Sequence, residues 1–163
     1  MIERIEKLLK DYPAMIQERN CTAHEVAHFQ GVTVEEVIES MYSIRPDGER
    51  VRASGTSEKT AQIALNYKSK MEEMNRDWYD QLAAKLKVLT DELIFFDSAL
   101  AALSGNLPGI MRDMVVGQMT WDALAERYYV SRRMIGKYRR KAIRELDMLY
   151  QNHDRLATDY MLG

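Results

Sequence analysis

The sequence predicts an all-α protein, and three observations support this class. Strong helix formers (Ala, Leu, Met, Glu, Lys and Arg) dominate the 163 residues, whereas only 8 Gly and 3 Pro are available for turns. Apolar residues recur at steps of three and four along almost the whole chain. No stretch alternates with the period of two that a half-buried strand requires. We expect a small N-terminal helical region, a long central helix and a C-terminal helix-turn-helix.

Composition also excludes several classes of protein. A hydrophobic content of 46 % and a charged content of 29 % are typical of a folded domain rather than a disordered chain. No apolar run approaches the roughly 18 residues of a membrane span, so we expect no membrane partner. The N-terminus is charged and amphipathic, unlike a signal peptide, and the single Cys21 cannot form an internal disulfide. These features predict a cytoplasmic protein.

The N-terminal region, residues 1–45, is expected to hold short helices. The first spans roughly residues 2–11, after which Pro13 either starts a second turn of helix or bends the first one. Two capping boxes predict further helix starts, at Thr22 with Glu25 and at Thr33 with Glu36. A polar linker over 46–57 should follow, because Arg45-Pro46-Asp47-Gly48 has the residues of a turn.

A long helix is predicted over residues 58–104, with an apolar stripe close to a coiled-coil seam. The stripe consists of Ile63, Tyr67, Met71, Met74, Trp78, Leu82, Leu86, Leu89, Leu93, Phe96, Leu100 and Leu103. An unbroken helix of this length would span about 70 Å, more than a small globule can cover. We therefore expect it to pair with a second copy in a homodimer. The alternative is an intramolecular hairpin bent near Thr90, in which the stripe is core.

A helix-turn-helix is predicted within residues 107–152, followed by a tail over 153–163. Thr120 should cap the first helix of the motif, Tyr129-Val130 should form the turn, and Ser131 should cap the long final helix. The residues expected to pack where these helices meet are Ala125, Val130 and Ile135.

The formal net charge is −2, from 23 Lys and Arg against 25 Asp and Glu, which is unlike the basic balance of a nucleic-acid-binding domain. The charges are unevenly distributed, however. Residues 127–144 hold eight basic residues and no acidic one, which leaves 15 basic and 25 acidic residues elsewhere. Near-neutrality is therefore an average over a basic segment and an acidic remainder.

The basic residues gather on one face of the predicted final helix. At about 100° per residue, those within about 60° of the pole opposite the apolar side are Arg133, Lys137, Arg140, Lys141 and Arg144. A cationic face opposite an apolar one suits a helix in a DNA major groove. The first two residues are placed to reach base edges, and the other three to meet phosphates. The alternative is a solvated basic helix without a ligand.

Two further residues are candidates for DNA binding. Gly136 costs helix stability, roughly 0.8–1 kcal/mol relative to Ala, and its lack of a side chain would permit close approach to DNA. Arg132 and Arg139 point toward the apolar side by the same angular count, so Arg132 is only a marginal member of the set.

Three stretches then resemble the promoter-reading region of sigma-70-type factors. They are Leu107-Pro108, Thr120-Trp121-Asp122-Ala123-Leu124-Ala125-Glu126-Arg127 and Val130-Ser131-Arg132-Arg133-Met134-Ile135. The whole chain resembles the small phage-encoded regulators of the RinA and ArpU type, through looser matches at Leu8-Leu9-Lys10-Asp11-Tyr12-Pro13 and Ser57-Glu58-Lys59-Thr60-Ala61. The resemblance implies DNA binding near promoters and control of late phage or prophage genes. One departure is Tyr129, which stands where the turn often has Gly.

A second motif, His24-Glu25-Val26-Ala27-His28, matches the zinc-peptidase pattern HExxH. A peptidase also requires a third zinc ligand and a strand that holds the substrate, and neither pattern is found. A structural zinc site at Cys21, His24 and His28 similarly lacks a fourth ligand. We therefore expect no metal, no cofactor and no catalytic residue, and a zinc peptidase is kept as the enzyme alternative.

The same segment also has helix-turn-helix spacing, because residues 22–37 can be laid on residues 120–135. Gly31 then falls on Tyr129, and Val37 falls on Ile135. The second helix of this copy would carry Glu35, Glu36 and Glu39 and no basic residue, so it should repel DNA. We interpret it as a structural or protein-binding copy, with RNA polymerase as a candidate partner.

The sequence thus predicts a non-catalytic, dimeric regulator of transcription that reads double-stranded DNA with its final helix. The alternative within DNA binding is a small terminase subunit, which recognises packaging sites with a helix-turn-helix and forms rings.

Overall fold

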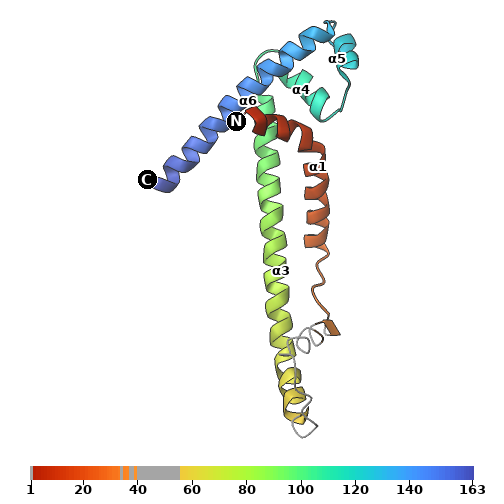
Figure 1. Cartoon of the computed structure of the whole chain (residues 1–163), viewed down its shortest axis with the longest axis vertical. Helices are drawn as coiled ribbons and strands as arrows, with labels where there is room; N and C mark the ends of the chain where they lie inside the picture. The colour runs from red at the N-terminus through yellow and green to blue at the C-terminus, as the bar shows by residue number, and fades with distance from the viewer. Residues whose placement is uncertain (1, 34, 37–38, 40–55) are drawn as a thin grey trace, which may run out of the picture. The chain divides into compact units, whose positions relative to one another are not determined.

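The computed structural model describes residues 2–33, 35–36, 39 and 56–163. These residues contain helices and no strand, which confirms the predicted all-α class (Figure 1). The helices are α1 (Ile2–Ala27), α3 (Thr56–Ala101), α4 (Leu107–Val115), α5 (Trp121–Arg127) and α6 (Arg132–Leu162). None of the described helices has an apolar stretch long enough to span a bilayer. All but the end of the predicted linker 46–57 lies outside the described residues.

The chain divides into two compact units, and each is described by itself. The first consists of Met1–Asn20 with Val88–Gly163, and the second is Cys21–Lys87. The first unit therefore combines the start of α1 and the end of α3 with α4, α5 and α6. The predicted tail over 153–163 is helical, because α6 continues to Leu162.

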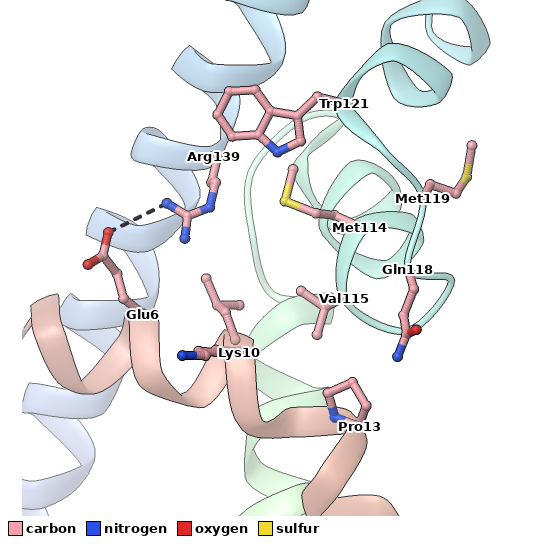
Figure 2. Close-up of a pocket in the computed structure, with 10 residues that line it drawn as sticks. Glu6, Lys10, Pro13, Met114, Val115, Gln118, Met119, Trp121 and Arg139 are labelled. Carbon is pink, nitrogen blue, oxygen red and sulfur yellow. Dashed lines mark hydrogen bonds and ion pairs between the residues drawn. The ribbon is translucent and has the colours of Figure 1, made fainter.

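Helix α1 is longer than the helix predicted over residues 2–11. It continues through Pro13 to Ala27, and Figure 2 shows its ribbon changing direction at Pro13. Proline lacks the N–H that would bond a carbonyl one turn earlier, and its ring displaces that carbonyl, so a bend is the expected response. Of the two alternatives for Pro13, the structure shows the bend.

The two predicted capping boxes have different outcomes. Thr22 is only 6 % exposed and lies inside α1, so the predicted helix start at Thr22 is wrong. The helix already supplies backbone partners there, and no open N–H groups require a cap. The box at Thr33 is confirmed, because its N–H donates to Glu36 Oε2 at 2.8 Å and the Glu36 N–H donates to Thr33 Oγ1 at 3.2 Å.

The burial of the apolar stripe of α3 changes along the helix. Leu93, Phe96 and Leu100 are each at most 6 % exposed and belong to the main core of the first unit. This end of the stripe is therefore intramolecular core rather than a seam between two chains. From Tyr67 to Leu89 the described stripe residues are half-buried, apart from Trp78, which is exposed.

The main core of the first unit draws buried side chains from α1, α3, α4 and α6. Its members include Ile5, Leu8, Leu9, Tyr12, Ala99, Leu103, Leu107, Met111, Val115, Ala142, Ile143, Leu146 and Tyr150. At its edge the Tyr12 hydroxyl donates to Asp97 Oδ1 at 2.6 Å. Burial, and secondly this bond, raise the pKa of Tyr12 to about 12, so the hydroxyl stays protonated as a donor.

Helices α4, α5 and α6 pack on one another as the predicted helix-turn-helix (Figure 1). Both predicted caps are confirmed. The hydroxyls of Thr120 and Ser131 accept from the N–H groups of Ala123 and Met134, each at 3.2 Å. A second buried cluster of Ile110, Leu124 and Ile135 lies between the three helices, with Ala125 and Val130 packed against it.

The turn between α5 and α6 places Tyr129 in the left-handed region, with φ of +54°. A β-carbon in this region costs roughly 1–2 kcal/mol, which is why glycine is common there. The Tyr129 side chain is 96 % exposed, so little packing offsets this cost.

In the second unit, the segment after α1 contacts α3 at Gly31, which has φ of +78°. A β-carbon at Gly31 would collide with the Asn75 side chain, whose Oδ1 accepts the Val32 N–H at 2.6 Å. Glycine is therefore required both by the backbone angle and by the close approach. The Phe29 ring packs edge-on against Trp78 and Tyr79, with ring centroids 5.3 and 5.4 Å away.

We expect Tyr129→Gly to raise the free energy of unfolding by up to about 1 kcal/mol. Removing the β-carbon relieves the left-handed strain, and the larger entropy of glycine in the unfolded chain offsets part of the gain. Urea denaturation followed by circular dichroism measures the change. Tyr129→Ala is the control, because it keeps the β-carbon and should leave stability almost unchanged. If both variants raised the free energy of unfolding equally, the β-carbon at position 129 would not be strained.

A second prediction concerns Glu145, which receives two hydrogen bonds from Ser104 in the turn after α3. The hydroxyl and the N–H of Ser104 donate to the carboxylate at 2.6 and 2.9 Å, and these bonds lower the pKa of Glu145. A carboxyl with a lowered folded-state pKa stabilises the fold above its unfolded pKa, and this contribution is lost as the pH falls through the folded pKa.

Glu145→Gln should therefore reduce the free energy of unfolding most at about pH 7 and least at about pH 3. Urea titrations of the wild type and the variant across this range measure the difference. Glu126→Gln, at an exposed position of α5, provides the control and should show no such trend. A penalty for Glu145→Gln that is independent of pH would show that the charge of Glu145 is not involved.

Candidate nucleic-acid interface

The first half of α6 has one buried and one exposed side. Ile135, Ala142, Ile143 and Leu146 are buried on the side that faces the two clusters. The opposite side carries exposed basic residues, which we call the cationic face: Arg133, Lys137, Arg140, Lys141 and Arg144. All five residues that the sequence places opposite the apolar side are thus on the surface. Because the other helices pack on the apolar side, the cationic face remains accessible in the described structure.

Ion pairs separate the eight basic residues of 127–144 into two groups. Three of them pair with acidic residues of other helices: Arg127 with Asp113 at 3.3 Å, Arg132 with Asp122 at 3.4 Å and Arg139 with Glu6 at 3.5 Å. In the part of the chain that the structure describes, Arg133, Lys137, Arg140 and Arg144 make no ion pair. Lys141 lies near Glu145 and contributes to the lowering of its pKa.

The angular count places Arg132 and Arg139 toward the apolar side, and the structure agrees for Arg139 but not for Arg132, whose side chain is 68 % exposed. Arg139 is largely covered, with a side chain that is 28 % exposed and that reaches Glu6 on α1. The Arg132 side chain instead lies on the surface beside α5. Its guanidinium is 6.0 Å from the centroid of the Trp121 ring, in addition to its ion pair with Asp122. Helix α5 thereby positions Arg132.

The expected role of Gly136 in close approach to DNA is wrong. Gly136 is buried, and a β-carbon built on it would lie 3.3 Å from Cζ3 of the Trp121 ring. Gly136 lies on the flank of α6, about 100° from Ile135, and the first residue of α5 covers that flank. The absence of a side chain at Gly136 therefore accommodates Trp121 and not a nucleic acid.

Sequence reasoning missed the contribution of Asp113 on α4. Its Oδ2 accepts the Tyr128 hydroxyl at 2.6 Å and pairs with Arg127, while its carbonyl accepts the Met119 N–H at 3.1 Å. Burial, and secondly the bond to Asp113, raise the pKa of Tyr128. Asp113 thus fixes the end of α5 before the turn. A single acidic residue in an amphipathic helix has no distinctive pattern, so no sequence signal could have found it.

A cavity of about 400 Å³ lies where α1, the α4–α5 connection and α6 meet (Figure 2). Figure 2 shows the Glu6–Arg139 pair at one side and the Trp121 ring at another. Gln118, with φ of +51°, also lines the cavity. None of the residues of the cationic face lines it, so the cavity and that face are separate surfaces of the first unit.

The HExxH stretch lies at the C-terminal end of α1. Helix α1 ends at Ala27, so His28 lies just beyond the helix, and its ring stacks on His24 with centroids 4.2 Å apart. Within the described residues, no group of three His, Cys, Asp or Glu side chains is arranged to hold a metal ion.

The helix-turn-helix spacing of residues 22–37 is reproduced only in part. Gly31 has a positive φ, as Tyr129 does at the aligned position. However, α1 continues through Thr22, so a separate first helix is absent there. Val37, the counterpart of Ile135, lies outside the described residues.

The contact of Trp121 with Gly136 predicts coupling between the two residues. In a Trp121→Ala background, Gly136→Ala should raise the free energy of unfolding by about 0.8–1 kcal/mol, the intrinsic helix preference of alanine. In the wild-type background the new β-carbon meets the ring, so most of this gain should disappear. A double-mutant cycle in urea measures the coupling. Equal gains in the two backgrounds would show that the ring does not fill this space.

No protein-family model matches the chain, and comparisons with curated proteins and with solved structures also find no match.

Proposed function

We propose that this protein is a sequence-specific regulator of transcription that binds double-stranded DNA through the start of α6. The observation that carries the proposal is that acidic residues pair with only some of the basic residues of 127–144. Acidic side chains pair with the cations at the edges of the motif, whereas Arg133, Lys137, Arg140 and Arg144 make no ion pair with the described residues. An accessible group of cations on one helix face is the electrostatic footprint of a nucleic-acid-binding surface.

The proposed mechanism is non-catalytic and divides the cationic face into two parts. Arg133 and Lys137 lie in the first turns of α6, where a recognition helix meets base edges in the major groove. Arg140, Lys141 and Arg144 lie further along and meet phosphates, which fixes the register of the protein on the duplex. Arg132, already held by Asp122 and Trp121, contacts DNA at the edge of this surface.

The sequence resemblance supports a narrower form of the proposal. The similarity to sigma-70-type promoter-reading regions and to phage-encoded regulators suggests control of late phage or prophage genes in the bacterial cytoplasm. RNA polymerase is then the proposed protein partner of the N-terminal region. We also propose that the protein acts as a homodimer.

A small terminase subunit is the alternative within DNA binding, because such a subunit also recognises DNA with a helix-turn-helix. The two functions differ in assembly. Light scattering would report the mass of a ring of many subunits for a terminase component, and that of a dimer for the proposed regulator. The same purified protein can be analysed for zinc, and stoichiometric zinc would favour the peptidase alternative instead.

Replacing both Arg133 and Lys137 with Ala should abolish the preference for specific DNA sequences. Target sequences are first selected from a random pool with the wild-type protein, and gel shifts then compare one of them with a scrambled duplex. Lys7→Ala with Lys68→Ala is the control pair, because it removes the same charge from exposed positions outside α6. Circular dichroism confirms that all variants are folded. Retained sequence preference in the α6 variant would refute the proposed recognition surface.

Replacing Lys141 and Arg144 with Ala should have a different signature. Without these cations, binding to target and scrambled DNA weakens by similar factors. The slope of log K against log salt concentration also falls by about 0.9 for each phosphate that is no longer neutralised, or about 2 for the pair. Fluorescence anisotropy at several salt concentrations measures this slope. An unchanged slope would show that these two residues do not meet phosphates.

A further inference from the structure

The cavity between α1, the α4–α5 connection and α6 has the size of a small-molecule site. Its volume of about 400 Å³ falls within the usual range of ligand pockets, roughly 300–1,000 Å³. Every residue that lines it belongs to the first unit, so the site is complete within that unit. No residue of the cationic face lines it, so the proposed DNA contact gives the cavity no role.

Part of the cavity wall is apolar. Leu9 of α1 and Val115 of α4 line it as buried side chains. Met114 and Met119 are half-buried, and the Trp121 ring, which is 37 % exposed, forms one side (Figure 2). Methionine side chains are flexible and polarisable, and they make favourable contacts with aromatic rings. This part of the wall therefore suits a ligand with an aromatic or other apolar body.

The polar part of the wall supplies hydrogen-bond donors that lack acceptors. Among the described residues, no acceptor or acidic partner pairs with the Lys10 ammonium, and none accepts the Trp121 indole N–H. Arg139 donates from Nη1 to Glu6 Oε1 at 3.5 Å, and its other N–H groups donate to none of the described residues. Figure 2 shows Lys10 and Arg139 at the same side of the cavity as Glu6, with the indole nitrogen on the edge of the ring nearer Met114. A ligand that brings acceptor oxygens would satisfy these donors.

The charges of the lining residues do not balance. Lys10 and Arg139 are positive, and Glu6 is the one acidic residue that lines the cavity. The contact between Arg139 and Glu6 is also longer than a strong charge-assisted hydrogen bond, which usually measures about 2.7–2.9 Å. One further negative charge near Lys10 and Arg139 would neutralise the site.

We propose that this cavity binds a small organic monoanion, a carboxylic acid with an aromatic or other apolar body. The carboxylate accepts from Arg139 and Lys10, and the apolar body lies against Trp121 and the two methionines. A guanidinium suits a carboxylate because its planar N–H groups match the two oxygens. Binding here goes beyond the proposed DNA contact and does not rest on it, because the cavity and the cationic face are separate surfaces.

The first experiment titrates three probes into the isotope-labelled full chain without DNA and follows the indole N–H signals of Trp121 and Trp78 by NMR. Phenylacetate has a carboxylate and a ring, phenylacetamide is its neutral analogue, and acetate lacks the ring. Phenylacetate should shift the Trp121 signal saturably and leave that of Trp78, in the second unit, unchanged. The other two probes should bind roughly tenfold or more weakly, since each lacks one half of the recognition. An unshifted Trp121 signal, equal shifts of both signals, or another probe that binds as tightly as phenylacetate would each overturn the proposal.

The second experiment repeats the phenylacetate titration with variants of α1, whose folding circular dichroism verifies. Lys10→Gln removes one carboxylate donor and should weaken binding roughly tenfold. Lys7→Gln is the matched control, because it removes the same charge from an exposed position of α1 that does not line the cavity. Glu6→Gln should instead tighten binding, because it removes the negative charge that competes for Arg139. Equal affinities of Lys10→Gln and Lys7→Gln, or weaker binding to Glu6→Gln than to the wild type, would overturn the proposed position of the carboxylate.

Discussion

Burial of the apolar side of α6 is the constraint on which the C-terminal half of the structure depends. Ile135 closes the cluster between α4 and α5, while Ala142, Leu146 and Tyr150 join the core formed with α1 and α3. Each large apolar side chain contributes roughly 1.5–3 kcal/mol when buried. Because both clusters use the same helix, its rotation about its own axis is fixed. The direction of the cationic face follows from that rotation, and no additional contact is needed to orient it.

Acidic side chains from other helices form ion pairs with some of the arginines near this surface. Asp113, Asp122 and Glu6 each pair with an arginine at the margin of the motif, at 3.3 to 3.5 Å. Ion pairs that are open to solvent on at least one side contribute only about 0–1 kcal/mol each, so these pairs orient arginine side chains more than they stabilise the fold. Their effect is to hold these three arginines against neighbouring helices, whereas Arg133, Lys137, Arg140 and Arg144 make no ion pair with the described residues. The acidic remainder of the chain then opposes non-specific contact between other surfaces and DNA.

The proposed DNA contact uses the side of α6 opposite its buried apolar stripe. The stripe that is covered by α1, α3, α4 and α5 up to Tyr150 is left open at Leu156 and Tyr160. A single period of about 3.6 residues thus produces both the buried stripe and the cationic face.

The sequence by itself determined the helical class, the caps at Thr120 and Ser131 and the exposed basic face. These features depend on helical period and on hydrogen bonds between residues three positions apart, so the local sequence contains them. Tertiary structure decided that α1 continues through Thr22, that Trp121 covers Gly136, and which part of the α3 stripe is core. It also decided which arginines are paired, as Arg139 and Glu6 are 133 residues apart in the chain. No local pattern specifies such contacts, because they arise only when distant helices pack together.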